Sequence, residues 1–313
     1  MGVAAIATML ILLVIEIMFS FENAIINAKI LTTMSEFWQT MFLSVGIIIA
    51  IFGMRIVFPI AIVAISTGLP WKEVLDLALN NPTEYSAQLD KAEPSILAFG
   101  GAFLLMLATA FFTDTHNKVT WIKKPERFVK RFSSRWTPAA VTAGAIGVVA
   151  LLSDHTQTVL TAGAVGIVTY LAIHGLTDLF EKFQSKPVGS KKALQKTGIA
   201  AFMTFMYLEL LDASFSLDGV IGAFAITQQV VLIAAGLGAG ALWVRSMTVY
   251  MVRRGTLGRY RYLEHGAHYT VLVLAFVMLV SELVHLPEAF AGTAGLLLIG
   301  SSIYASKRYQ ATK

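Results

Sequence analysis

Long apolar stretches alternate with short polar segments along the whole chain, and we assign nine of them as membrane-spanning. A helix needs roughly 20 apolar residues to cross the hydrocarbon core of a bilayer. The strict alternation of apolar and polar residues that a transmembrane barrel needs is absent from the sequence. The pattern therefore predicts an all-α, polytopic transmembrane helical bundle with spans at about 3–31, 39–66, 95–113, 138–152, 156–176, 198–227, 229–252, 267–285 and 288–305.

Composition agrees with this class. Hydrophobic residues make up 56% of the 313 residues, a larger fraction than the core of a soluble protein requires, and charged residues make up only 14%. The chain contains no cysteine, so it has neither disulfides nor thiolate metal ligands. Any bound metal ion would therefore be held mainly by oxygen atoms. The first apolar stretch lacks a basic n-region and carries acids in its middle, so we expect it to be retained as a helix rather than cleaved as a signal peptide.

Basic residues gather in alternate loops, as expected for loops on the cytoplasmic side of a membrane. Segment 114–135 has seven lysines and arginines, segment 182–196 has five lysines, and segment 253–264 has four arginines. The loop at 67–94 has two lysines against five acids. This predicts an external N-terminus and a cytoplasmic C-terminus, in what we take to be a bacterial inner membrane. Anionic lipid and topology explain the net charge of +5 better than a nucleic-acid partner, which we do not expect.

Two apolar segments carry the same acidic motif. Each copy reads acid, two residues, Phe, Ser, an apolar residue, acid, and then Asn or Gly, over residues 16–23 and 212–219. Ionisable residues at membrane depth are costly and usually functional, so a repeated pair indicates a site. The copies fall in the first and sixth predicted spans, which cross the bilayer in opposite directions. Each is followed in the next span by one arginine, Arg55 or Arg245.

An inverted repeat of this kind is typical of secondary transporters, in which substrate sites lie near the midplane between the repeats. We divide the chain into a first repeat at 1–136, central spans and a linker at 137–197, and a second repeat at 198–313. The two acids of each motif are six residues apart, which is about 240° around a regular helix. Both acids can face one site only if the helix is interrupted, so we expect breaks in the first and sixth spans.

Carboxylate, amide and hydroxyl oxygens suit a divalent cation such as Mn²⁺, Mg²⁺ or Ca²⁺. Arg55 and Arg245 would compensate the acids when the ion is absent. A purely structural role, in which these acids only pair the arginines and hold helices together, is the alternative. The predicted metal ligands are Glu16, Glu22, Asn23, Asp212, Ser216 and Asp218, and the possible accessory residues are Ser20, Asn27, Glu209, Asp114 and His268.

The two motifs, together with the stretches at 99–106 and 262–269, resemble the TerC family of integral membrane proteins. The resemblance covers nearly the whole chain and is closest to a branch described only as a domain of unknown function. It implies a polytopic protein associated with tellurium resistance and, in several members, manganese export, with the motif acids and Asn23 as the residues that bind the metal ion. Glu22 stands where many relatives have Asp, and Gly219 where Asn is common, so ion preference is less firmly implied than family.

We therefore expect a transporter that exports a divalent metal ion, Mn²⁺ foremost, by alternating access at a carboxylate site. A non-transporting membrane scaffold in the tellurite or metal stress response is the alternative. We do not expect an enzyme, since signatures such as HExxH and GxSxG are absent from the sequence. No cofactor is required beyond the transported ion, and the partners are the lipid bilayer and that ion. The sequence leaves the oligomeric state open, with a homodimer as one option.

Overall fold

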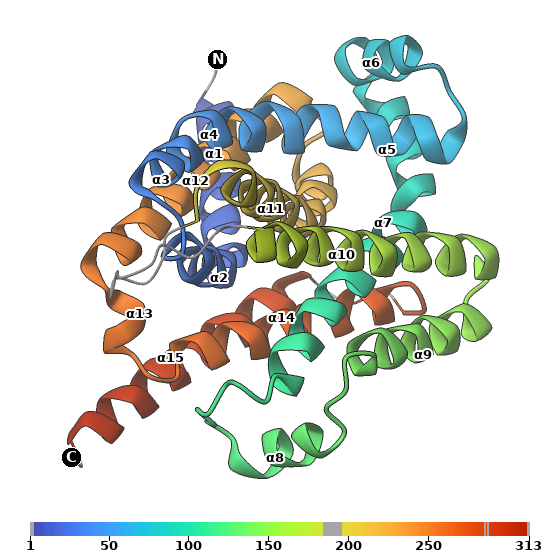
Figure 1. The fold of residues 1–313 in the computed structure, drawn as a ribbon. Coiled ribbons are helices and arrows are strands. Elements are labelled where there is room, and N and C mark those ends of the chain that lie inside the picture. The colour runs from blue at the N-terminus through green and yellow to red at the C-terminus, as the bar shows by residue number, and fades with distance from the viewer. Residues whose placement is uncertain (1–2, 184–195, 285, 287, 312–313) are drawn as a thin grey trace.

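The computed structural model describes residues 3–183, 196–284, 286 and 288–311. This part of the chain is almost entirely helical and contains no β-strand, only an isolated bridge between Met34 and Lys196 (Figure 1). The prediction of an all-α bundle is confirmed. The elements are α1 (Val3–Phe19), α2 (Phe21–Leu31), α3 (Glu36–Leu43), α4 (Val45–Ile48), the π-helix η1 (Ile49–Val57), α5 (Phe58–Thr67), α6 (Trp71–Asn80), α7 (Pro82–Thr113), α8 (Lys123–Arg131), α9 (Thr137–Leu152), α10 (Thr156–Phe183), α11 (Gly198–Ile226), α12 (Val230–Arg254), α13 (Thr256–Arg259), α14 (Leu263–Ser281) and α15 (Glu288–Ala311).

Helix α7 passes through the middle of the molecule and packs against α10, α14, α9, α5 and α11 (Figure 1). Two adjacent glycines allow the close approach of α14. A Cβ atom at Gly101 would lie 2.8 Å from Cγ of Leu279, and one at Gly100 would lie 3.4 Å from Sδ of Met278. Small residues permit such contacts between helix backbones, as the glycine pair in the sequence indicates.

The N-terminal helix α1 packs against α12, a helix more than 200 residues away in the sequence. Gly236 and Gly240 lie one turn apart on the face of α12 that meets α1. A Cβ atom at Gly236 would lie 2.7 Å from Cβ of Leu12, and one at Gly240 would lie 2.6 Å from Cβ of Glu16. The first predicted repeat is thus joined to the second by direct backbone packing beside a motif acid.

The number of candidate spans is smaller than the nine predicted. Six helices are long and apolar enough to cross a membrane, and a seventh span results if α1 and α2 are counted as one bent span. Helix α9, expected to span at 138–152, has only 16 residues. Helix α15, expected to span at 288–305, is not among the candidate spans found within the residues searched. These counts use length and composition of the described residues alone.

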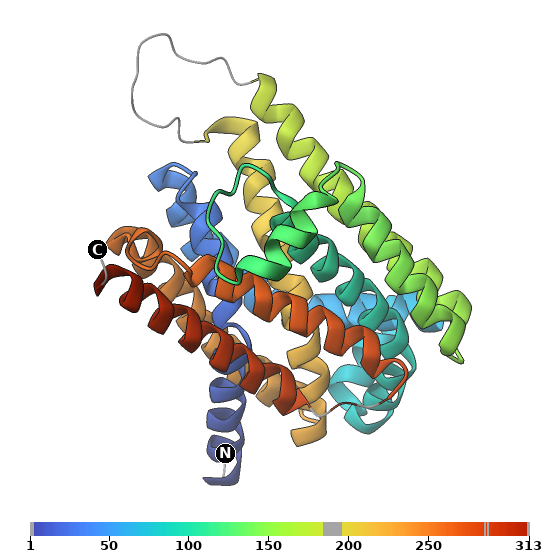
Figure 2. The same cartoon turned by 90° about the horizontal axis from the view of Figure 1, so that it is seen from below.

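Three basic segments among the described residues gather at one end of the bundle. The backbone N–H of Tyr262, between α12 and α14, donates to Oγ of Ser306 near the end of α15 at 2.9 Å. The hydroxyl of Tyr269 on α14 donates to Glu126 of the basic helix α8 at 3.3 Å. The segment after α7, the segment before α14 and the end of α15 therefore share one side, as the loop charges predict. Figure 2 shows the same bundle from below, with the paired helices α9 and α10 along one edge.

Candidate functional site

The first motif copy lies where the N-terminal span bends. Helix α1 ends at Phe19 and α2 begins at Phe21, and the two axes meet at 54°. Ser20 stands at the corner, where its backbone N–H donates to the carbonyl of Glu16 at 3.0 Å and its hydroxyl donates to Oε1 of Glu16 at 3.1 Å. Glu16 and Glu22, on either side of the bend, are both buried. The predicted break in the first span is confirmed.

The second copy lies on a helix without a break. Helix α11 is continuous through Asp212 and Ser216, so the predicted interruption of the sixth span is wrong. The reason is that Glu209 and Asp212 lie three residues apart and share one face of a regular helix. One partner can therefore reach both carboxylates without opening the backbone. Ser216 lies one turn further along the helix. The side chain of Asp218 lies outside the described residues, so its assignment as a ligand stays a prediction.

Arg245 on α12 is that partner, and it is fully enclosed. Its Nη1 donates to Oε1 of Glu209 at 2.9 Å, and its Nη2 donates to Oε2 of Glu209 and to Oδ2 of Asp212, each at 2.8 Å. Nη1 also donates to the carbonyl of Phe42 at 3.2 Å, and the guanidinium lies 4.3 Å from the centre of the Phe42 ring. Gly46 leaves room for this group, because a Cβ atom there would lie 2.7 Å from Oε1 of Glu209.

Arg55 performs the equivalent pairing for the first copy. It lies in the π-helix η1, where its Nη1 donates to the carbonyl of Ala50 at 2.5 Å and its Nη2 pairs with Oε1 of Glu16. Both arginines predicted to compensate the motif acids thus contact an acid of their own repeat. The wide turns of a π-helix occur mostly at functional positions, and here they hold a buried cation against the bend.

The two copies meet in the interior. Nδ2 of Asn23, from the first copy, donates to Oδ1 of Asp212, from the second, at 2.7 Å. Near this contact, a Cβ atom at Gly219 of the second copy would lie 3.6 Å from Oε2 of Glu16. Segments almost 190 residues apart therefore form one buried polar cluster, as the repeat predicts.

This cluster, which we call the acid–arginine core, has an excess of negative charge. Its described members are Glu16, Asn23, Arg55, Glu209, Asp212 and Arg245. With every acid ionised, three carboxylates face two guanidinium groups. Glu22, the residue before Asn23, is a further buried acid outside these contacts. No described basic residue forms an ion pair with Glu22, whose Oε2 would lie 3.9 Å from a Cβ atom at Gly295 of α15.

Neutral oxygen atoms flank the core. Oδ1 of Asn23, Oδ1 of Asn27 and Oγ of Ser216 are buried and have no hydrogen-bond partner. Buried polar atoms normally have partners, so three such oxygens near an acidic cluster are unusual. No three Asp, Glu or His side chains within the described ranges converge closely enough to hold a metal ion. Glu16, Glu209 and Asp212 each contact an arginine instead of one another.

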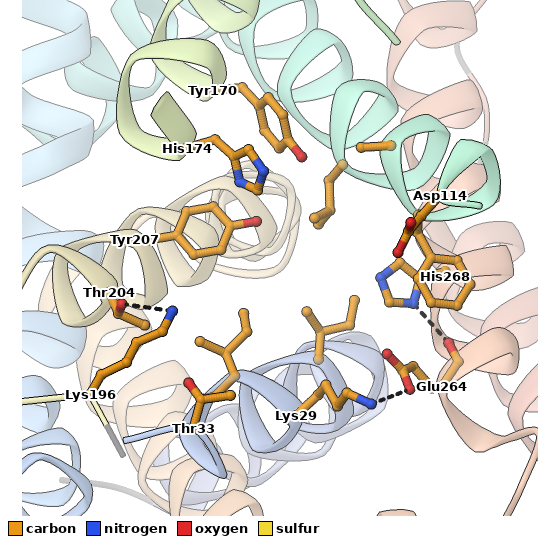
Figure 3. Close-up of a pocket in the computed structure, with 15 residues that line it drawn as sticks. Lys29, Thr33, Asp114, Tyr170, His174, Lys196, Thr204, Tyr207, Glu264 and His268 are labelled. Carbon is orange, nitrogen blue, oxygen red and sulfur yellow. Dashed lines mark hydrogen bonds and ion pairs between the residues drawn. The ribbon is translucent and has the colours of Figure 1, made fainter. Parts of the chain in front are cut away.

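A cavity of about 400 Å³ lies between the core and the basic end of the bundle (Figure 3). Its walls come from the second half of α2, the first half of α11, and parts of α7, α10 and α14. Lys29 on α2 forms an ion pair with Glu264 at 2.9 Å at its edge. His268 is 6% exposed; its Nδ1 hydrogen-bonds to the carbonyl of Glu264 at 2.8 Å, and its ring stacks on Phe111. Figure 3 shows the other imidazole nitrogen directed into the cavity, close to Asp114.

The two accessory residues Asp114 and His268 thus share this cavity and not the core, whereas Glu209 belongs to the core itself. Sequence reasoning missed Phe42 and Gly46, which enclose Arg245. A single glycine inside the bulky apolar run at 41–52 is the only signal that indicated a close approach there. It also missed Lys29 and Glu264, since nothing in the sequence brings α2 beside α14.

A family model described as "Protein of unknown function (DUF475)" matches residues 21–313 of the chain. No curated protein matches, and no solved structure matches.

Proposed function

The chain belongs to the DUF475 family, whose description gives no activity, and we propose that it is a membrane transporter that exports a divalent metal ion, with Mn²⁺ as the favoured substrate. The observation that carries the proposal is the contact between Asn23 and Asp212, which joins the two motif copies at 2.7 Å inside the acid–arginine core. Two oppositely oriented copies of an acidic motif with a shared centre are what alternating access between repeats requires. The resemblance to the TerC family supports the same reading.

The charge of the core fits the substrate. Together with the buried acid Glu22, its carboxylates exceed the two arginines by two negative charges, which equal the charge of one divalent cation. The unpaired oxygens of Asn27 and Ser216 are ligands that Mn²⁺, Mg²⁺ and Ca²⁺ accept. In the described arrangement the arginines occupy Glu16 and Asp212. We infer that this is the state without an ion, and that an arriving cation competes with the guanidinium groups for the carboxylates.

The cavity at the basic end offers the ion a path to the acid–arginine core. It reaches Ile26 on α2, one turn beyond Glu22, and Tyr207 on α11, just before Glu209. Asp114 and His268 offer a carboxylate and an imidazole along this path. If the basic loops are cytoplasmic, an ion enters here and moves to the core. It leaves on the other side when the repeats shift against each other.

A non-transporting scaffold is the competing proposal, and one observation favours it. Each arginine already satisfies an acid of its own repeat, so the core has a complete structural explanation for Glu16, Glu209 and Asp212. Glu22 is not explained in this way, because among the described side chains it has no basic partner. Its role therefore separates the two proposals.

The test is metal flux into proteoliposomes for the Glu22→Gln variant, compared across Mn²⁺, Ca²⁺ and Mg²⁺. Removing one charge from a site that holds a dehydrated divalent ion costs about 1.5–3 kcal/mol, or roughly ten- to over a hundredfold in affinity. Flux at low ion concentration should fall by that factor while the folded yield stays normal. The control is Glu73→Gln at an exposed acid on α6, which should leave flux unchanged.

A second arm pairs Glu16→Gln with Arg55→Met. Either change alone should lower folded yield or flux, and the double variant should recover yield, because neither charge is then left unpaired. We expect the recovered protein to transport poorly. Normal flux in the double variant, together with normal flux for Glu22→Gln, would contradict the metal-site proposal and favour the scaffold.

A further inference from the structure

Helix α8 is a short basic helix between α7 and α9, at the end of the bundle where the other basic segments lie (Figure 1). Five basic side chains on it and just after it are exposed, and none pairs with an acid among the described residues: Lys123, Lys124, Arg127, Arg131 and Arg135. Large aromatic side chains accompany them. Phe128, Phe132 and Trp136 are 59%, 61% and 67% exposed. Basic residues beside exposed aromatics are typical of a helix that lies at the headgroup level of a membrane.

The inner face of α8 is fixed to the bundle by a buried carboxylate. Glu126 accepts hydrogen bonds from the backbone N–H groups of Trp121 and Ile122 at 2.9–3.1 Å, and from the hydroxyl of Tyr269 at 3.3 Å. These contacts hold the start of the helix against α14. The basic side chains therefore project from a fixed platform instead of a free loop.

Beneath α8 lies an apolar cavity of about 370 Å³. Its walls include Phe128 of α8 and Phe132 just after that helix. The remaining walls come from one face of α7 between Leu105 and Phe112, from Val141 of α9 and from Leu272 of α14. The seven steps between residues 105 and 112 correspond to a depth of about 10 Å along α7. This depth and an almost wholly apolar wall suit part of an acyl chain.

We propose that this cavity and the basic side chains of α8 form a binding site for one anionic diacyl phospholipid. The phosphate-containing headgroup contacts Lys124, Arg127 and Arg131, and one acyl chain enters the cavity between α7 and α9. Charge complementarity selects an anionic lipid over a zwitterionic one, because each lysine or arginine near an anionic headgroup contributes about fivefold in affinity. The cavity distinguishes this site from the general attraction of basic loops to a membrane surface. This inference does not depend on the proposed transport activity.

The test measures lipid binding to the purified, delipidated full-length protein in detergent, by native mass spectrometry and by thermal stabilisation. The probes are phosphatidylglycerol and phosphatidylcholine with the same dioleoyl chains. Phosphatidylglycerol should bind and stabilise, and phosphatidylcholine should do so at least tenfold less well. The triple variant Lys124→Gln/Arg127→Gln/Arg131→Gln should lose roughly a hundredfold in affinity for phosphatidylglycerol.

Two controls separate the site from simpler explanations. Arg253→Gln/Arg254→Gln/Arg259→Gln removes the same charge from exposed positions at the same end of the bundle, away from this cavity, and should leave binding unchanged. Val141→Trp fills the cavity from a half-exposed position, so the protein should fold and lose the bound lipid. Glycerol phosphate should not displace the lipid. Equal loss in both triple variants, full binding by Val141→Trp, or displacement by glycerol phosphate would each overturn the proposal.

Discussion

The two copies of the acidic motif share one sequence pattern but stand on different backbones. The first copy lies at a 54° bend between α1 and α2, and its arginine comes from the π-helix η1. The second lies on the unbroken helix α11, and its arginine comes from the regular helix α12. Irregular backbone is therefore confined to the first half of the core. The same spacing of acids does not impose the same local structure.

The arginine on the regular helix also makes more contacts than the arginine in the π-helix. Arg245 binds two carboxylates, one of them through both nitrogens, and is covered by Phe42. Arg55 binds one carboxylate and one carbonyl of its own helix. Bends and π-helices are common where a membrane helix must rearrange. We expect the second copy to be the fixed half of the core and the first copy to be the half that changes.

The largest effect should come from removing the arginine of the fixed half. Arg245→Met leaves Glu209 and Asp212 buried beside each other without a cation, which costs about 3–5 kcal/mol. Folded yield and thermal stability in detergent should collapse. Arg55→Met leaves only Glu16 without its cation and should therefore lower the stability clearly less.

The control for this pair adds Glu209→Gln and Asp212→Asn to Arg245→Met. Neutralising Glu209 and Asp212, which have lost their arginine, should restore much of the lost stability. The unpaired amide groups will keep the stability below that of the unchanged protein. Equal losses for Arg55→Met and Arg245→Met would remove the distinction between a fixed and a changing half.

A smaller effect is expected where the fixed half meets the bend. Gly240→Ala would place a methyl group 2.6 Å from Cβ of Glu16, so α1 must move away from α12 at a cost of about 1–3 kcal/mol. Thermal unfolding in detergent measures this loss. The matched control is Gly147→Ala on α9, where nothing lies within 4 Å, and stability there should be unchanged or slightly higher. Similar behaviour of the two variants would argue against tight packing of α1 on α12.

The smallest effect compares the two equivalent serines. Ser20→Ala removes a hydrogen bond to the Glu16 carboxylate and should cost about 1.5 kcal/mol in the free energy of unfolding. Ser216→Ala removes a buried hydroxyl without a partner, so stability should hold or rise. If Ser216 is a metal ligand, stabilisation of the protein by Mn²⁺ should nevertheless weaken in that variant. A large loss of stability for Ser216→Ala without metal would show that its hydroxyl has a structural partner after all.

The all-α class and the main helices follow from the sequence because burial in a bilayer demands long apolar helices with satisfied backbones. The number of spans did not follow. The predicted spans at 138–152 and 288–305 form helices, but the first has only 16 residues and the second is not among the candidate spans found in the residues searched. Hydropathy detects a helix reliably, whereas crossing a membrane also depends on length and on what the helix packs against.

Within the site, the sequence by itself determined which residues are unusual. Five of the six predicted ligands and both arginines lie buried in or beside one core, because charges inside an apolar bundle must find partners. Only the tertiary structure decided the partners. It assigned Glu209 to Arg245, kept α11 straight, and moved Asp114 and His268 to a separate cavity. Helical periodicity fixes which residues share a face, but the packing of α1 on α12 and of α3 over Arg245 depends on contacts between distant segments, which local sequence patterns do not encode.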